Sequence, residues 1–197
     1  QDGREIEASL VIGADGRQSF TREWMGIGTR AWSYHQRALV CNAEHENPHH
    51  NIAVEHFRPS GPFATLPMND SPDGTPRSSV VWTEHGHARD SALHWDQESF
   101  DAALTARFPK AYGRVRQVGK RYSYPLGLIH AHRYIGPRMA LVADAAHGIH
   151  PIAGQGLNLG LRDIAEIASL VCDALTQGED PGSDTLLETY QRQRRLD

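Results

Sequence analysis

The stretch that decides the fold runs from Ala140 to Asp163 and reads ALVADAAHGIHPIAGQGLNLGLRD. Its first residues are apolar and lead to Asp144, as in a buried strand that delivers an acid to a turn. A loop with glycine and proline follows, and a helix is predicted to begin after Gly154. The first turn of a helix has free backbone N–H groups and partial positive charge. This helix start therefore favours an anionic or electron-accepting ligand.

The glycines at this helix start have two interpretations. Glycine lets a ligand approach the backbone closely, which fits a binding site at Gly154 and Gly156. Alternatively, these two residues and Gly160 only permit tight packing of the helix, and bare glycines at this spacing favour that interpretation. The acid at Asp144, just upstream, shifts the balance toward a ligand site.

The rest of the chain predicts a mixed α/β fold of the α+β type. Residues 6–12 are mostly apolar and indicate a buried strand that ends before Asp15. Between 34 and 85, strand-like runs alternate with turns at hairpin spacing, which predicts a largely antiparallel sheet with flanking helices. Asp96 is expected to cap a helix that Pro109 ends.

The helix after Gly154 has apolar residues at steps of three and four, so we expect it to bury that face and to end at Gly178. A last helix is expected from Thr185 to Arg195. The face predicted to be buried comprises Leu157, Leu161, Ile164, Ala168, Val171 and Leu175.

Composition excludes several classes of protein. The chain has 197 residues and a net charge of −4, without a basic block, so we expect no nucleic-acid partner. No apolar run approaches the roughly 20 residues needed to span a bilayer, and residues 1–5 do not resemble a signal peptide. The sequence therefore predicts a soluble, cytoplasmic protein.

Cysteine and histidine usage indicates neither a disulfide nor a metal site. The two cysteines, Cys41 and Cys172, are expected to be reduced thiols. The chain has 12 histidines, but their spacing in loops such as His45 to His50 is looser than that of zinc ligands. We therefore expect no metal.

Several motifs in this sequence resemble those of class A flavoprotein monooxygenases. The run from His150 to Asp163 is similar to their flavin-contacting motif, in the form found in ubiquinone-biosynthesis hydroxylases of the 2-polyprenyl-6-methoxyphenol hydroxylase type. Residues 13–16, with Ser19 and Arg22, resemble the Asp-Gly motif that lies near the FAD pyrophosphate. The run from His56 to Pro67 resembles strands of the substrate domain. Shorter similarities occur at Tyr124–Leu126 and Tyr190–Arg194, so the resemblance covers essentially the whole chain.

The resemblance implies a domain division and a set of cofactor contacts. Residues 1–30 and 133–197 would belong to an FAD-binding domain, and residues 31–132 would form a substrate-binding β-sheet domain. Asp144 would bind the ribityl chain, and the helix start would face the flavin. The implied cofactor-binding residues are Asp15, Gly16, Arg22, Asp144, Pro151, Gly154, Gln155, Gly156, Leu157 and Asn158. The implied substrate-binding residues are Phe63, Leu66 and Pro67.

The resemblance also implies an activity. An enzyme of this family, reduced by NAD(P)H, hydroxylates the aromatic ring of a polyprenyl phenol in ubiquinone biosynthesis through a flavin C4a-hydroperoxide. A hydroxylase of soluble aromatic compounds and a flavin-free binding or assembly module of the same fold are the alternatives. Further hypotheses are peripheral association with the inner membrane, a ubiquinone-biosynthesis complex and a homo-oligomer. The spacing identifies no general base, ring position or preferred nicotinamide.

Two departures from the family pattern bear on the cofactor. Ala143 stands where the family usually has glycine, which adds a methyl group close to the expected ribityl path. The sequence contains no G-x-G-x-x-G motif, the element that anchors the ADP half of FAD on a helix N-terminus. We therefore expect a fragment covering the C-terminal two-thirds of an enzyme, with weak or no FAD binding and no activity on its own.

Overall fold

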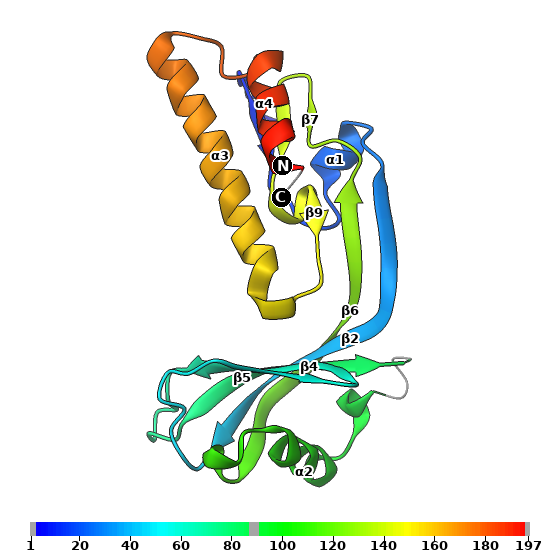
Figure 1. Cartoon of the computed structure of the whole chain (residues 1–197), viewed down its shortest axis with the longest axis vertical. Coiled ribbons are helices and arrows are strands. Elements are labelled where there is room, and N and C mark those ends of the chain that lie inside the picture. The colour runs from blue at the N-terminus through cyan, green and yellow to red at the C-terminus, as the bar shows by residue number, and fades with distance from the viewer. Residues whose placement is uncertain (1–2, 87–90, 196–197) are drawn as a thin grey trace. The chain divides into compact units, whose positions relative to one another are not determined.

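The computed structural model describes residues 3–86 and 91–195 (Figure 1). The chain divides into two compact units, each with its own hydrophobic core. The first unit combines residues 1–32 with 127–197, and the second comprises residues 33–126. Two long strands, β2 (Thr29–His45) and β6 (Val115–Ala131), have residues in both units.

The first unit contains a small sheet in the order β1-β8-β7, with β1 (Val11–Gly13) parallel to β8 (Met139–Leu141) and β7 (Ile135–Gly136) antiparallel to it. The buried strand expected over residues 6–12 is wrong in extent and in burial. Ile6 is 90% exposed and Val11 43% exposed. The physical reason is that pairing with β8 orders the backbone of β1, whereas side-chain burial also needs an element packed over the face of the strand, and Val11 and Ile12 remain about half exposed.

Three helices complete the first unit: α1 (Phe20–Trp24), α3 (Gln155–Gln177) and α4 (Asp184–Arg194). As predicted, α3 ends at Gly178, whose positive φ of 73° suits glycine. The last helix begins at Asp184, one residue before its predicted start, because Ser183 caps it. Figure 1 shows α3 and α4 side by side. Short elements connect β8 to α3: η4 (Ala143–Ala145), β9 (His147–Gly148) and η5 (Ile152–Gly154).

The buried face of α3 differs from the predicted one. Its buried residues are Gly160, Asp163, Ile167 and Ala174, which lie on the face that packs in the core with α4 and η4. The predicted apolar stripe is instead largely exposed, with Leu157 at 71% and Leu161 at 53%. Periodicity identifies an apolar face, but among the described residues this face has no element packed over it.

The second unit contains most of the larger sheet, whose strands follow the order β3-β4-β5-β2-β6-β9. Strands β3 (Val54–Arg58), β4 (Gly61–Met68) and β5 (Arg77–His85) join β2 in antiparallel pairs. The largely antiparallel sheet predicted from the hairpin spacing is therefore confirmed. At the other edge, β9 pairs with the end of β6 at Ile129 and His130, inside the first unit.

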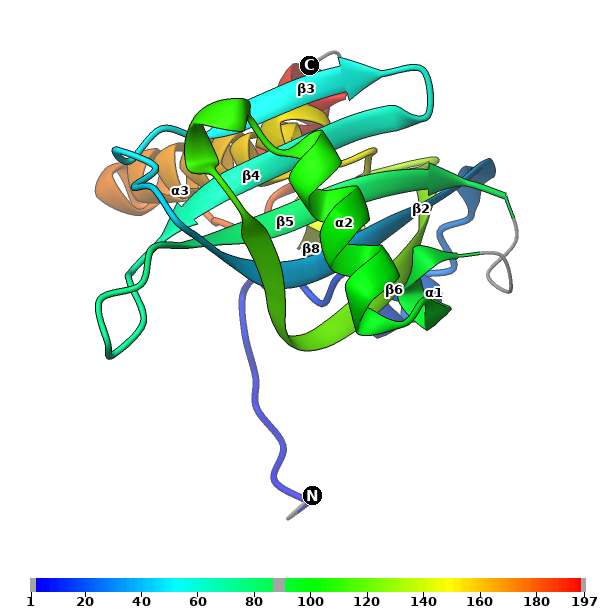
Figure 2. The ribbon, with the colours of Figure 1, turned by 90° about the horizontal axis from the view of Figure 1, so that it is seen from below.

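One helix covers the sheet of the second unit. Figure 2 shows α2 (Gln97–Arg107) lying across the strands. Asp96 caps it as predicted, since its Oδ1 accepts a hydrogen bond of 2.8 Å from the Ser99 amide. Phe100 and Leu104 face the sheet and are fully buried. The short helices η2 (Ala92–His94) and η3 (Lys110–Tyr112) flank α2 in sequence.

No helix in the described part of the chain is both long enough and apolar enough to cross a membrane. Cys41 is a buried free thiol, and burial raises its pKa to about 12. Cys172 is an exposed free thiol.

Candidate functional site

The Asp-Gly motif at residues 13–16 and the motif from Ala140 to Asp163 lie side by side where the neighbouring strands β1 and β8 end. Gly13 pairs with Leu141 in the parallel register, and the Val142 amide donates a 3.0 Å hydrogen bond to the Gly13 carbonyl. Asp15 and Asp144 therefore both follow the carboxyl ends of neighbouring parallel strands, where open α/β sheets place their ligands. Arg22 links the motifs further, because its Nη1 donates to the Ala145 carbonyl at 2.8 Å.

Asp144 lies in the turn that follows β8 and has an open carboxylate. The residue is half-buried within η4. Within the described ranges, its side chain accepts no hydrogen bond. The neighbouring amide of Ala143 donates to Asp163 instead, at 2.8 Å. Because a half-buried carboxylate without donors is costly, Asp144 is suited to accept hydrogen bonds from a ligand.

The backbone at Ala143 adopts a conformation that disfavours an alanine. Its φ is +52°, in the left-handed region, where a Cβ costs roughly 1–2 kcal/mol. This explains in physical terms why glycine suits this position, where the sequence departs from the family pattern. The turn keeps this conformation because Asp163 holds the Ala143 amide from the side of α3.

The three glycines of the helix start have three different roles. Gly154 has a φ of +64° and occupies the N-cap of α3, so its role is conformational. A Cβ at Gly160 would lie 2.9 Å from the Ala143 Cβ, so Gly160 permits packing. At Gly156 the nearest atom would be Ile149 Cγ1 at 3.9 Å, an ordinary contact. Neither packing nor backbone conformation requires glycine at 156, and close approach of a ligand there stays a prediction.

Asp163, His147 and Arg194 form a buried charged cluster in the first unit. Asp163 is fully buried and accepts hydrogen bonds from the His147 ring at 2.6 Å and from Arg194 Nε at 2.8 Å, besides the Ala143 amide. Burial alone would raise the pKa of the Asp163 carboxyl, but the hydrogen bonds from His147 and Arg194 outweigh it and hold this pKa below its ordinary value. The cluster ties the turn after β8, the start of β9, α3 and α4 together.

Asp163 belongs to the quoted motif, but the sequence did not reveal its structural role. Its partner Arg194 lies on α4, and the pair forms only through the packing of α4 against α3. The sequence signal that points to the cluster is an acid on the face of α3 whose other buried residues, Gly160, Ile167 and Ala174, are small or apolar. Such a charge is stable only when it is paired.

Asp15, predicted to lie near the FAD pyrophosphate, organises its own turn. Its carboxylate accepts hydrogen bonds from the Ser19 hydroxyl at 2.5 Å and the Thr21 amide at 2.8 Å, which fixes the start of α1. Burial opposes ionisation, but these hydrogen bonds together outweigh it and lower the pKa of Asp15 to about 2. Gly16 follows with a φ of +82°. A cofactor role for Asp15 and Gly16 stays a prediction.

The remaining predicted cofactor residues lie close together in sequence at the start of α3. Pro151 precedes η5, and Gln155, Leu157 and Asn158 are exposed in the first turn of α3, beside the half-buried Gly156. Gly154 provides no side-chain cap for this turn. The helix start therefore offers exposed backbone N–H groups next to the Asp144 turn.

The three predicted substrate residues do not share one face of the sheet. Phe63 is 2% exposed and packs in the core between Trp82 and Phe108, on the α2 side. Leu66 is 43% exposed and, three positions along β4, points to the opposite side. Pro67 is on the same side as Phe63. These three residues therefore do not form one surface, because side chains alternate along a strand. Their role in substrate binding stays a prediction, and Leu66 is the most exposed of the three.

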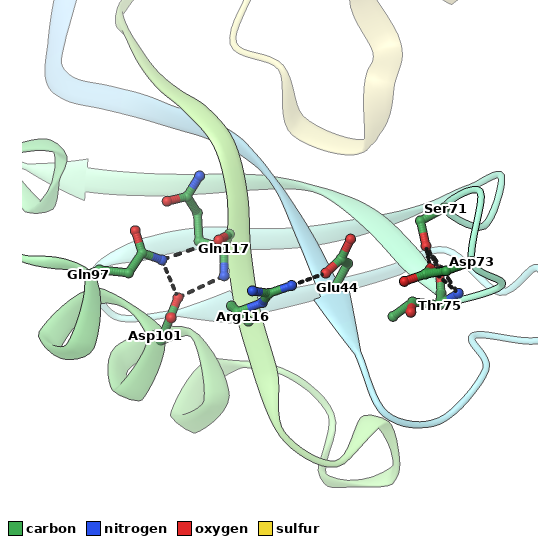
Figure 3. Close-up of polar contacts among 8 residues, drawn as sticks. All are labelled: Glu44, Ser71, Asp73, Thr75, Gln97, Asp101, Arg116 and Gln117. Atoms are coloured by element: carbon green, nitrogen blue, oxygen red, sulfur yellow. Dashed lines mark hydrogen bonds and ion pairs between the residues drawn. The ribbon is translucent and has the colours of Figure 1, made fainter.

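Several histidines and carboxylates of the second unit have structural partners. His45, which is buried, lies 2.7 Å from the Asn47 carbonyl and 3.0 Å from the Ser78 hydroxyl. Figure 3 shows three carboxylates of the second unit with the groups that donate hydrogen bonds to them. Arg116 Nη2, for example, donates to the Glu44 carboxylate at 2.7 Å. Across the described ranges, no group of three or more His, Cys, Asp or Glu side chains is placed to hold a metal ion.

Comparison with known proteins gives a consistent picture. The family model described as "FAD binding domain" matches residues 1–196. Ubiquinone hydroxylase UbiL of Rhodospirillum rubrum is 50% identical over 196 residues, which are 100% of this chain and 44% of that protein. The 3-demethoxyubiquinol 3-hydroxylase of Escherichia coli is 36% identical over 195 residues, 99% of this chain and 48% of that protein. The chain thus spans less than half the length of these relatives.

The fold also matches solved structures. The crystal structure of PqsL, a probable FAD-dependent monooxygenase from Pseudomonas aeruginosa, superposes with a TM-score of 0.70 at 25% identity. The match covers 98% of this chain and 53% of that protein. The mixed α/β architecture predicted from the sequence is therefore shared with flavoprotein structures.

Proposed function

Since the chain belongs to the family of FAD-binding domains, we propose that it forms the flavin-ring side of an FAD-dependent monooxygenase that hydroxylates a polyprenyl phenol in ubiquinone biosynthesis. NAD(P)H is the proposed reductant. The bound flavin would supply the redox chemistry that activates oxygen for ring hydroxylation. The residues present fit such a group, because the open carboxylate of Asp144 lies in η4, against which α3 packs, and the start of α3 follows farther along the same segment.

The observation that carries the proposal is Gly156. A side chain there would meet no close contact, yet the position has the residue that lowers helix stability by roughly 0.5–1 kcal/mol relative to alanine. A flat, partly anionic ring system held against the helix start explains the absence of a side chain. The exposed amides of Gly156, Leu157 and Asn158 would stabilise negative charge on that ring system.

The other residues of the turn would position the cofactor. Asp144 would accept hydrogen bonds from the hydroxyl groups of the ribityl chain, for which its carboxylate is open. Arg22, anchored to the Ala145 carbonyl, would keep the Asp-Gly turn next to this site. The relatives are about twice as long as this chain, and we propose that their remaining part provides the anchor for the ADP half of FAD.

The proposed substrate also suggests where the enzyme acts. A polyprenyl phenol partitions into the hydrocarbon region of a bilayer, since each buried methylene favours transfer by about 0.8 kcal/mol. We therefore propose peripheral association with the inner membrane rather than a spanning segment. Assembly with other enzymes of the pathway or with further copies is part of the same proposal.

The test uses the full-length protein with Gly156→Ala and Gly156→Val. We expect both variants to keep the melting temperature of the wild-type apoprotein and to lose bound FAD, with the larger loss for valine. Bound flavin is measured from the visible spectrum of the purified protein, and Asp173→Ala, on an exposed part of the same helix, serves as the control. Wild-type flavin content in both glycine variants, or no flavin in the wild type, would contradict the proposal and favour a flavin-free binding module.

A further inference from the structure

A pocket of about 520 Å³ lies entirely in the second unit, at the edge of the sheet beside the end of α2. Its floor consists of alternate residues of two strands. Val54 pairs with Thr65 and His56 with Phe63, so these side chains share the face that α2 covers. Its wall is the segment 106–110, which includes the end of α2. All the residues of the candidate flavin site belong to the first unit instead.

Two half-buried arginines line this pocket. Arg58 Nη2 donates to the Arg107 carbonyl at 3.2 Å, and Arg107 Nη1 donates to the Ala103 carbonyl at 3.0 Å. The Arg107 guanidinium also lies 3.9 Å from the centre of the Trp82 ring. Within the described ranges, neither guanidinium forms an ion pair with a carboxylate. Most of their N–H donors are therefore available to another acceptor.

The charge balance of the lining is positive. Arg58, Arg107 and Lys110 line the pocket, against one carboxylate, Glu55, among the described lining residues. Burial, together with the nearby charge of Arg58, lowers the pKa of Arg107 below its ordinary value, although the charge of Glu84 opposes this shift. Two neighbouring guanidinium groups that repel each other are stabilised when an anion lies between them.

Buried polar atoms at this pocket also have no partner. Thr65 is 1% exposed, and its hydroxyl oxygen has no hydrogen-bond partner in the described structure. The same holds for Arg58 Nε. Such atoms cost roughly 1–3 kcal/mol each when they remain unsatisfied. The contacts of Arg58 with α2 and of Arg107 with Trp82 explain the packing of these side chains, but not the unsatisfied donors or the absence of a counter-ion.

We propose that this pocket binds a small organic oxyanion, a carboxylate or phosphate ester attached to an apolar body. The fork of an arginine matches the oxygens of either group. Phe63, Phe108 and Val54 provide the apolar surface for the body of the ligand, and the volume falls in the range of small-molecule sites. The same oxyanion chemistry occurs on free metabolites and on lipid headgroups.

Binding of hexyl phosphate and hexanoate to the full-length protein tests the proposal, with the neutral hexanamide as the matched probe. We expect both anions to bind by calorimetry and the amide not to bind. Arg107→Gln and Arg58→Gln should each weaken anion binding by about ten-fold or more, the loss of a charge-assisted hydrogen bond. Lys120→Gln, on an exposed part of β6, is the charge-matched control and should leave binding unchanged.

Two further experiments complete the test: a third variant of the pocket and a comparison of lipid vesicles. Lys110→Gln, at the exposed mouth, should also weaken binding, and its wild-type flavin content and melting temperature verify that the fold is intact. Vesicles of phosphatidylglycerol, compared with phosphatidylcholine, distinguish a lipid headgroup from a free anion. Vesicle binding that the arginine variants abolish supports a headgroup as the oxyanion, and binding of hexyl phosphate alone supports a soluble one. Equal binding of hexanamide, or anion binding unchanged in both arginine variants, would overturn the proposal.

Discussion

Two carboxylates near the turn between β8 and α3 differ in how many hydrogen bonds they accept: Asp163 on the inner side and Asp144 on the outer side. On the inner side, Asp163 accepts hydrogen bonds from a backbone amide, His147 and Arg194, and is fully buried. On the outer side, Asp144 accepts none from the described residues and stands beside the exposed start of α3. The motif from Ala140 to Asp163 thus contains one carboxylate that stabilises the fold and one that accepts no hydrogen bond from the described residues.

The largest effect is expected for Asp163→Ala. Removing this carboxylate leaves the buried Arg194 and His147 without their acceptor, which should lower the free energy of unfolding by about 3–5 kcal/mol. Urea denaturation measures the loss. Asp180→Ala is the control, because its ion pair with Arg138 is about half exposed and should contribute no more than about 1 kcal/mol. Equal losses of unfolding free energy in the two variants would show that Asp163 stabilises the fold no more than an exposed ion pair does.

A second expected effect distinguishes two glycines of α3. Gly160→Ala places a Cβ 2.9 Å from that of Ala143, so we expect a destabilisation of about 1–3 kcal/mol from overpacking. Gly156→Ala has room and should leave stability unchanged or slightly raised. Thermal unfolding of both variants tests this difference. If both lose stability equally, the packing interpretation applies to both glycines.

The lowered pKa of Asp163 also predicts how the free energy of unfolding changes at acid pH. The folded pKa of Asp163 lies below the ordinary value of 3.8, so its contribution is fully present above that value. The contribution decreases as the pH falls through the folded pKa. In Asp163→Asn the free energy of unfolding should therefore depend less on pH below about 4 than in the wild type. Unfolding free energies measured between pH 2 and 6 give the comparison, and parallel curves would refute this role for Asp163.

The smallest effect is expected for Ala143→Gly. Relief of the left-handed alanine is worth roughly 1–2 kcal/mol, and the added freedom of the unfolded chain offsets part of it, so we expect a net gain of about 0.5–1 kcal/mol. Differential scanning calorimetry detects such a shift. A lower melting temperature in this variant would show that the turn is not strained at Ala143.

Local signals in the sequence were sufficient for much of the fold. Asp96 capped α2 and Gly178 ended α3, because capping depends on residues adjacent in the chain. The alternation of strands and turns predicted the antiparallel sheet for the same reason.

Features that depend on distant partners were missed. The Leu157 face of α3 was expected to be buried, but burial depends on what packs against an element and not on its own periodicity. The role of Asp163 requires Arg194 from another helix, which spacing does not reveal. Phe63 was assigned to the substrate side because a motif match does not state which way a strand faces.

The most direct test of this account compares FAD affinity and stability in a single variant, Asp144→Ala, made in the full-length protein. The account predicts that FAD binding weakens by about 1–3 kcal/mol, the range for hydrogen bonds to a charged group, while the free energy of unfolding of the apoprotein stays within about 0.5 kcal/mol of the wild type. A variant that unfolds more easily but binds FAD as tightly as the wild type would contradict the account, since the outer carboxylate would then be structural.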